Sequence, residues 1–452
     1  MLKRSLIACS LVVAIWSIWR AGCSPEAPSP FHAGRRNVVL FLATAAHGLS
    51  NVHLATILTL AEKHPSVQVH YASFAGRKPE VERLSAMAAA NYPAARPIVW
   101  HELPPPDYIQ TAERAYGTPK GLVAPPGLGG IDKLATDVQV LMDPWTIEEH
   151  WTLYQNMSRK IIEVDPAAVV LDNLFRPAVE ATQDSNYAHM VISPNSLIDV
   201  LVSKMPWGAM FWKYPPIGSG HPYPVPWRLI PANVYLQRTI LADRGIRLPN
   251  DLMAIMRPGV PWLSTSFAEA SLPIAMVPEG APGRARCRNG RILCKMKRLG
   301  DFDDSFPEPV RKHVDSGRVR VQPWIKADPT ALFATGNVKL SVHHGGAGCY
   351  HEAVLHGVPD VILPMCFDHY NYAATAEYLG IGVWPTKDTA PEWDPETLGQ
   401  ALVDALSGTS GEAMRDKAAR LGETARQYEG RYMAAREVAA MAAKGQDKLD
   451  EE

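Results

Sequence analysis

The stretch NVVLFLA, residues 37–43, is a continuous apolar run that follows Arg35 and Arg36 and precedes a turn of small residues. Such a run predicts a strand buried on both faces, as in a parallel sheet. Residues 51–63 then show helical periodicity, and residues 68–74 (QVHYASF) predict a second strand. The order strand, turn, helix, strand is the opening of a doubly wound α/β domain.

The same alternation continues through the chain. Further strands are expected at residues 167–171, 190–193, 338–342 and 361–363, and further helices at residues 349–356, 396–406 and 412–441. A chain of 452 residues is too long for one compact core. We therefore expect two Rossmann-like α/β domains, residues 37–257 and 258–452, with the boundary near residues 258–264.

The composition is that of a globular protein, with 47% apolar and 20% charged residues. The net charge is −1, from 45 basic and 46 acidic residues, and no long basic run occurs outside residues 284–298. This balance does not suggest a nucleic-acid partner. The six cysteines form no CxxC pair, so neither a zinc site nor a disulfide framework is indicated.

The first 23 residues have the layout of a signal peptide. Lys3 and Arg4 precede an apolar run at residues 6–19, and Arg20 ends it. The run is shorter than the span of about 20 residues that crosses a bilayer. A short signal-anchor that attaches the protein to a membrane remains the alternative.

Two further features agree with the secretory pathway. Residues 24–36 begin with a proline-rich stretch and are interpreted as a linker, and Asn156-Met157-Ser158 is a glycosylation sequon, which is a weak signal because such triplets occur by chance. We expect a protein of the endoplasmic reticulum or secretory pathway, either lumenal or membrane-anchored.

An aromatic segment lies at residues 207–227, among prolines and glycines. It contains Trp207, Phe211, Trp212, Tyr214, Tyr223 and Trp227. A segment of this kind either covers a hydrophobic ligand or packs on the surface, and the sequence leaves both interpretations open.

The strongest local signal is HHGGAGCYHE, residues 343–352. A strand ends, glycines allow a ligand to approach the backbone, and a helix begins. The unpaired N–H groups of a helix N-terminus bind anions. His344 can add a hydrogen bond to a phosphate, and Glu352 can accept one from a ribose hydroxyl. A plain tight turn is the alternative when this stretch is taken alone.

The stretch PMCFDHYNYA, residues 364–373, follows the next expected strand, and Trp324 lies upstream. Together with residues 343–352, these resemble the donor-binding signature of the family 1 UDP-glycosyltransferases, from about residue 321 to 383. The resemblance implies the GT-B architecture, in which two Rossmann-like domains face each other across a cleft. The first domain would bind the acceptor and the second the UDP-sugar, which is a co-substrate, so no cofactor and no metal is expected.

The resemblance implies how the nucleotide is held. Trp324 would stack on the uracil ring, and His344 would contact the diphosphate. The backbone at Gly346, Gly348 and Cys349 would contact the diphosphate as well.

It also implies contacts to the two sugars of the donor. Glu352 would bind the ribose, and Asp368 would bind hydroxyls of the transferred sugar. His369 stands where the family often has glutamine, so the identity of the sugar is left open.

Residues 45–56 (AAHGLSNVHLAT) resemble the fungal branch of the same family, in which a histidine follows the first strand. Transfer to a hydroxyl needs a base near neutral pH, and His47 is expected at the carboxyl end of that strand. Asp172 matches the aspartate that holds the ring. The implied mechanism is a displacement that inverts the anomeric centre, with UDP stabilised by a helix N-terminus rather than a metal. His53, inside the expected helix, is the second choice for the base and is expected to pack or to cap instead.

One region departs from the family. The second domain should open with a strand and a glycine/serine turn after residues 273–278, but residues 280–291 (GAPGRARCRNGR) are basic and lack strand character. Residues 292–297 (ILCKMK) then resemble the next strand. The second domain is therefore expected to lack its opening strand, with residues 280–291 as a solvated loop. The triplet at residues 301–303 (DFD) is interpreted as a chance match to a metal-binding DxD motif.

These observations favour an enzyme that moves a hexose from a UDP-sugar, such as UDP-glucose, to a hydroxyl of a small lipophilic acceptor. The resemblance implies acceptors such as sterols, polyketides, terpenoids or lipids. The alternative is a non-catalytic sugar-nucleotide-binding or scaffold protein derived from such an enzyme. An epimerase of the same architecture is a third hypothesis, and the aromatic segment and the His47/Asp172 pair speak against it.

Overall fold

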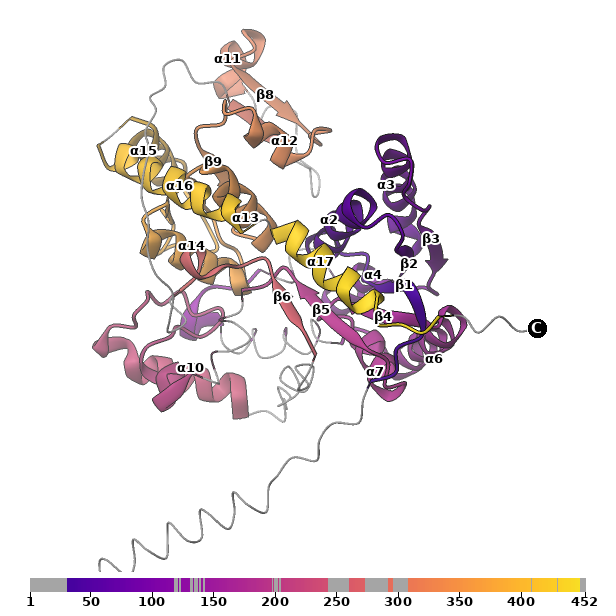
Figure 1. Cartoon of the computed structure of the whole chain (residues 1–452). Coiled ribbons are helices and arrows are strands. Elements are labelled where there is room, and N and C mark those ends of the chain that lie inside the picture. The colour runs from indigo at the N-terminus through magenta and orange to yellow at the C-terminus, as the bar shows by residue number, and fades with distance from the viewer. Residues whose placement is uncertain are drawn as a thin grey trace, which may run out of the picture.

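The computed structural model describes residues 31–117, 123–130, 143–196, 205–242, 260–272, 292–295, 308–407, 409–428 and 430–447, and residues 121, 133, 137, 140, 198 and 202. The ribbon forms two lobes, the first coloured indigo to magenta and the second orange to yellow (Figure 1). The signal-like leader, residues 280–291 and the triplet at 301–303 lie outside the described residues.

A six-stranded parallel sheet forms the first lobe. Its strands are β1 (Arg35–Leu42), β2 (Gln68–Ser73), β3 (Val99–Glu102), β4 (Pro166–Leu171), β5 (His189–Ser193) and β6 (Trp262–Ser264). Their order is β3-β2-β1-β4-β5-β6, and every neighbouring pair is parallel. The order reverses between β1 and β4, and open sheets of this kind bind ligands outside the carboxyl ends of the strands at that point.

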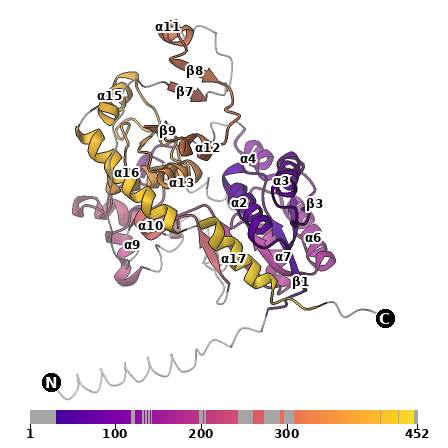
Figure 2. The ribbon, with the colours of Figure 1, turned by 45° about the horizontal axis from the view of Figure 1, so that its top comes forward.

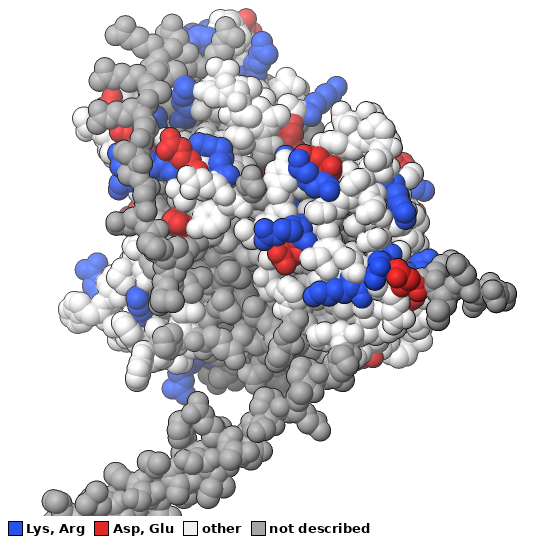
Figure 3. Space-filling model, viewed as in Figure 1, with Lys and Arg blue, Asp and Glu red and all other residues white. Residues whose placement is uncertain are grey.

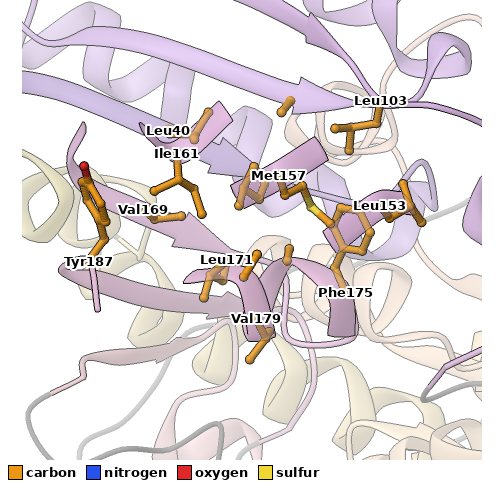
Figure 4. Close-up of a cluster of buried hydrophobic side chains, with 14 of the residues drawn as sticks. Leu40, Leu103, Leu153, Met157, Ile161, Val169, Leu171, Phe175, Val179 and Tyr187 are labelled. Atoms are coloured by element: carbon orange, nitrogen blue, oxygen red, sulfur yellow. The ribbon is translucent and has the colours of Figure 1, made fainter. Parts of the chain in front are cut away.

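The helices that cover the sheet are α2 (His47–Lys63), α3 (Lys78–Asn91), α4 (Tyr108–Tyr116), α6 (Ile147–Val164), α7 (Arg176–Asp184) and α17 (Gly430–Ala442). Successive side chains of a strand point to opposite faces. Leu40 of β1 therefore joins a cluster with α6 and α7, whereas Phe41 joins one with α2 and α17. Figure 4 shows the first cluster, in which Leu40 and Val169 of the sheet lie near Ile161 of α6. Both faces of the sheet are thus covered.

A smaller parallel sheet forms the second lobe, in the order β11-β10-β9. Its elements are β9 (Ser341–His343), α13 (Ala347–His356), β10 (Asp360–Ile362), α14 (Phe367–Leu379), β11 (Gly382–Val383), α15 (Pro395–Ser407) and α16 (Thr409–Gln427). A separate parallel pair, β7 (Ile292–Lys295) and β8 (Val319–Gln322), lies with α11 (Arg311–Asp315) and α12 (Pro329–Ala334). The remaining helices of the chain's middle part, α9 (Ala209–Trp212) and α10 (Ile230–Ala242), pack against each other.

The structure confirms the expected alternation of strands and helices and the GT-B arrangement of two α/β lobes. Most predicted elements are present with bounds shifted by a few residues. The expected strand at residues 338–342 is wrong in position, because β9 begins only at Ser341. Arg35 and Arg36 were assigned to the linker but belong to β1, where Arg35 bonds through its side chain to the carbonyl of Val164.

Two elements beyond residue 257 join the first lobe, which corrects the simple division at that position. β6 pairs with β5 in the first sheet. The helix expected at residues 412–441 is two helices, because α16 packs on α13 of the second lobe and α17 crosses to pack on α2 of the first. Figure 2 shows this crossing, and Gly430, a weak helix former, begins α17.

On the face in Figure 3, Lys and Arg lie beside Asp and Glu, and neither sign forms a large patch. Within the described ranges, no helix is both long and apolar enough to cross a bilayer. Asn156 of the sequon lies inside α6, whereas glycosylated sequons are expected in surface loops, which argues against a glycan at this position.

His150 of α6 contacts two carboxylates, that of Asp143 ahead of the helix and that of Glu180 in α7. Its Nδ1 lies 2.8 Å from Asp143 Oδ2, and its Nε2 lies 3.0 Å from Glu180 Oε2. The hydrogen bonds to Asp143 and Glu180 raise the pKa of His150 to about 9. An unfolded histidine has a pKa of about 6.5, so the folded state binds this proton more tightly.

We therefore expect this contribution to stability to be complete below about pH 6.5 and to be lost as pH rises through about 9. Thermal melts between pH 6 and 9.5 check it: the melting temperature of the native chain should fall toward that of His150→Gln as pH rises. Parallel curves for the two proteins would contradict the linkage.

Candidate active site

His47 is the first residue of α2 and lies beyond the carboxyl end of β1, where the sequence placed it. Its side chain is 62% exposed, so a substrate can reach the ring. The ring Nδ1 faces the guanidinium of Arg77 and lies 3.6 Å from Glu80 Oε1. Burial and then the Arg77 charge lower the pKa of His47, and Glu80 opposes them. The ring is therefore favoured in its neutral form, as a base requires.

Asp172 follows β4 and is fully buried. Its Oδ2 accepts hydrogen bonds from the Thr44 hydroxyl at 2.8 Å and from the Thr44 N–H at 3.4 Å, and its Oδ1 accepts one from the Leu174 N–H at 3.0 Å. Burial raises the pKa of Asp172, and these donors oppose the rise. The expected contact between His47 and Asp172 is not formed, because Thr44 and Leu174 satisfy the buried carboxylate instead.

Arg77 and Glu80 were not identified from the sequence. Arg77 ends the short helix η1 (Ala75–Arg77), is 1% exposed, and donates to Asn51 Oδ1 at 2.8 Å. It also forms an ion pair with Glu80 in the first turn of α3. A signal was present: an arginine and a glutamate one helical turn apart follow β2, whose carboxyl end lies beside that of β1.

His53, the second choice for the base, is buried inside α2 against the ring of Phe41. Burial lowers the pKa of His53 to about 3. Neither ring nitrogen has a hydrogen-bond partner among the described residues. His53 is therefore enclosed away from a substrate, in agreement with the expectation that it packs.

The glycine-rich turn between β9 and α13 is held by two buried side chains that the sequence analysis did not single out. The Gly345 N–H donates to His343 Nδ1 at 2.9 Å, so the proton of His343 is on Nε2, which donates to Asp360 Oδ1 at 3.1 Å. Gly345 has a φ of +90°. His343 and Asp360 thus fix the path of the turn.

The N-terminus of α13 carries no side-chain cap, and its N-cap residue is Gly346. The first N–H groups of this helix, from Ala347 to Cys349, are left without an intrahelical acceptor. They form an anion site of the kind that binds phosphate. Gly346, Gly348 and Cys349 lie in or beside this first turn, as expected from the sequence.

His344 and His369 meet beside the turn, with ring centroids 4.6 Å apart at 71°. Asp368 lies in the first turn of α14, and burial raises its pKa to about 6 against the pull of nearby backbone N–H groups. Glu352 lies in α13, where burial and then the charge of Asp328 raise its pKa to about 7. The structure thus brings the rings of His344 and His369 into contact. It places the carboxyl group of Glu352 on α13 and that of Asp368 on α14.

Trp324 follows β8 and is 58% exposed. The Lys295 ammonium lies 3.7 Å from the centroid of its ring, a cation–π contact. The positive charge of Lys295 is also a minor cause of the lowered pKa of His47 and of His344, each of which burial lowers most. The charge of Lys295 therefore acts on both the base expected in the first lobe and the donor turn of the second.

The aromatic segment divides into a packed part and an exposed part. Tyr214 and Tyr223 are buried, and Tyr223 meets the ring of Tyr378 in α14 with centroids 5.1 Å apart. Trp207 and Trp227 are 93% and 84% exposed. Surface packing therefore explains the tyrosines but not these two tryptophans.

The chain is similar to known glycosyltransferases. Residues 316–428 match the family model described as erythromycin biosynthesis protein CIII-like, C-terminal domain. Glycosyltransferase sdnJ of Sordaria araneosa is 27% identical over 90% of this chain and 98% of its own length. That alignment runs over 506 residues, which exceeds the length of this chain, so the relative carries residues that this chain lacks. Erythritol-mannosyl-transferase 1 of Mycosarcoma maydis is 32% identical over 27% of this chain and 20% of its own.

Solved structures share the fold. A UDP-glucosyltransferase from Polygonum tinctorium is 13% identical and covers 92% of this chain and 100% of its own, with a TM-score of 0.53. The calicheamicin glycosyltransferase CalG4 is 16% identical and covers 91% of this chain and 99% of its own, with a TM-score of 0.53. At these identities the likeness concerns the fold alone.

Proposed function

Since this chain belongs to the family 1 UDP-glycosyltransferases and is an enzyme of GT-B architecture, we propose that it moves a hexose from a UDP-sugar to a hydroxyl of a small lipophilic acceptor, with inversion at the anomeric carbon. The observation that carries this proposal is the uncapped N-terminus of α13 behind the Gly345 turn, beside His344. Such a site suits the diphosphate of a nucleotide sugar.

His47 is the base of the proposed reaction. It takes the proton of the acceptor hydroxyl, whose oxygen bonds to the anomeric carbon as the bond from that carbon to the UDP oxygen breaks. The negative charge that develops on UDP is stabilised by hydrogen bonds from the first N–H groups of α13 and from His344. Asp368 and His369 lie at the start of α14 and are proposed to contact the sugar.

The acceptor is proposed to be apolar because Trp207 and Trp227 leave large apolar rings exposed. Relatives support a small acceptor: one matched protein is a 3-alpha-mycarosylerythronolide B desosaminyl transferase, and the Polygonum enzyme glucosylates indoxyl. The leader supports a place in the secretory pathway, lumenal or membrane-anchored, and lies outside the described residues.

A non-catalytic nucleotide-binding protein is the second candidate, and two observations favour it. Lys295 covers the ring of Trp324 that would stack on uracil, and Asp172 does not hold His47. In that case the donor site would bind UDP without turnover.

Calorimetry with UDP tests the proposed donor site. A stacked base contributes about 1–3 kcal/mol by alanine substitution, so Trp324→Ala should weaken UDP binding by a factor between about 5 and about 150. Trp393→Ala is the matched control, because Trp393 is 55% exposed and Trp324 is 58% exposed. UDP release with an acceptor then separates the enzyme from the binding protein. A folded native chain that binds no UDP would overturn both candidates.

A further inference from the structure

A histidine that acts as a base through one ring nitrogen must carry a proton on the other and donate it to an acceptor. His47 has no hydrogen bond at Nε2 among the described residues, so this nitrogen is free to meet a substrate. Nδ1 must then hold the proton. The partner of Nδ1 therefore decides whether the ring can work as a base.

Arg77 cannot be that partner. A guanidinium only donates hydrogen bonds, so its contact with Nδ1 requires a lone pair there and leaves the ring proton on Nε2. This tautomer is unable to accept a proton at Nε2. The arrangement in the structure is thus a resting one, in which Arg77 holds the ring neutral.

Asp172 is committed elsewhere. Both of its oxygens accept hydrogen bonds, from Thr44 and Leu174, and the side chain is fully buried. Withdrawing this carboxylate toward His47 would leave the Thr44 hydroxyl without its partner at a buried position, which is unfavourable.

Glu80 is the carboxylate next to the ring. Its Oε1 lies 3.6 Å from His47 Nδ1, slightly beyond hydrogen-bond range, and its side chain is 28% exposed. Its other oxygen, Oε2, pairs with Arg77, which in turn is held by Asn51 of α2. Arg77 thus ties Glu80 to the helix that carries His47.

We propose that Glu80, rather than Asp172, is the carboxylate that positions His47 for catalysis, and that Arg77 holds Glu80 in place. This inference rests on the proposed transferase function. In the working state Arg77 gives up its contact with Nδ1 and keeps its ion pair with Glu80, so that Nδ1–H donates to Glu80 Oε1 and Nε2 accepts the proton of the acceptor hydroxyl. Glu80 then stabilises the imidazolium until that proton passes to solvent, and Nδ1 keeps its own proton throughout. Glu80 is a positioning residue, since it touches no reacting atom.

The charged groups that face His47 are Arg77 on η1, Glu80 on α3 and Lys295 on β7. Arg77 and Lys295 lower the pKa of His47, after the larger effect of burial, and Glu80 raises it. Removing the charge of Glu80 should therefore lower the pKa further. Removing that of Asp172, which is not among the causes of the shift, should leave it unchanged.

The first test needs no sugar transfer. The ring signal of His47 is assigned among the 15 histidines by its absence in His47→Gln, and its titration is followed by NMR in the native full chain. Glu80→Gln should shift the titration to lower pH, whereas Asp172→Asn should not. Glu82→Gln is the matched control, since Glu82 is exposed on the same helix. A shift in Asp172→Asn with none in Glu80→Gln would overturn the proposal.

The second test is kinetic. Glu80→Gln should lower kcat at least tenfold and move the acid limb of its pH profile to lower pH, with UDP affinity unchanged. Glu82→Gln should behave as the native chain. Equal kcat values and pH profiles in these two variants would also overturn the proposal. If the native chain transfers no sugar, the proposed function fails, and the NMR titration still decides whether Glu80 holds His47.

Discussion

His47→Ala is expected to reduce the rate of sugar transfer by a factor of about 10²–10⁴, the usual contribution of a general base. The acceptor hydroxyl would then have no side chain to take its proton. Because the side chain is 62% exposed, its removal should leave the fold intact. UDP affinity should also stay unchanged, because the proposed donor site lies in the second lobe. Steady-state UDP release and UDP calorimetry on the same preparation measure the two effects separately.

His64→Ala is a suitable control, because His64 lies just beyond the other end of the same helix. It should retain native kcat. If His47→Ala kept the native rate of transfer, another group would have to be the base. Weaker UDP binding together with a reduced rate would instead point to damage that reaches the donor turn.

Gly345→Ala is expected to weaken UDP binding strongly. The φ of this residue is +90°, and a Cβ there would lie 2.7 Å from Ile362 Cγ2 and 3.0 Å from the carbonyl oxygen of His369. A strained backbone of this kind costs of order 1–3 kcal/mol, and crowding a packed site costs typically about 1–3 kcal/mol more. Relief would require the turn to move, and with it His344 and the first N–H groups of α13. Calorimetry should show UDP affinity at least tenfold lower.

The control for this variant is Gly399→Ala in α15. A Cβ at residue 399 meets nothing within 4 Å. The Gly399→Ala variant should have a free energy of unfolding higher by roughly 0.5–1 kcal/mol, because alanine stabilises a helix relative to glycine. Native UDP affinity in Gly345→Ala would show that the turn is not where the diphosphate binds. Thermal melts of both variants separate lost binding from lost folding.

Much of the fold follows from local sequence pattern. The run at residues 37–43 predicts β1 because a short, almost continuously apolar run is typical of a strand covered on both faces, and α6 and α17 do cover it. The turn at residues 343–348 predicts an anion site because its glycines and the following helix are adjacent in the chain. Features of this kind depend on neighbours in sequence, so one sequence is enough to find them.

The partners of His47 could not be found in this way. Asp172 and Glu80 both follow strands that flank β1, so both were available to the ring by topology. The hydroxyl of Thr44 bonds to Asp172 and holds it away from the ring, whereas the guanidinium of Arg77 pairs with Glu80 and holds it beside the ring. Competition among hydrogen-bond donors at this scale depends on positions within an ångström, which residue spacing does not encode.

The sequence by itself determined the alternation of strands and helices, the glycine turn that suits a diphosphate, and the histidine placed at the end of the first strand. These depend on hydrophobic periodicity and on residues adjacent in the chain. Only the tertiary structure decided that α17 returns to the first lobe, that Lys295 covers Trp324, and that Glu80 rather than Asp172 lies beside His47. Each of these three contacts is between residues far apart in sequence, so it forms only when the sheets and helices have packed.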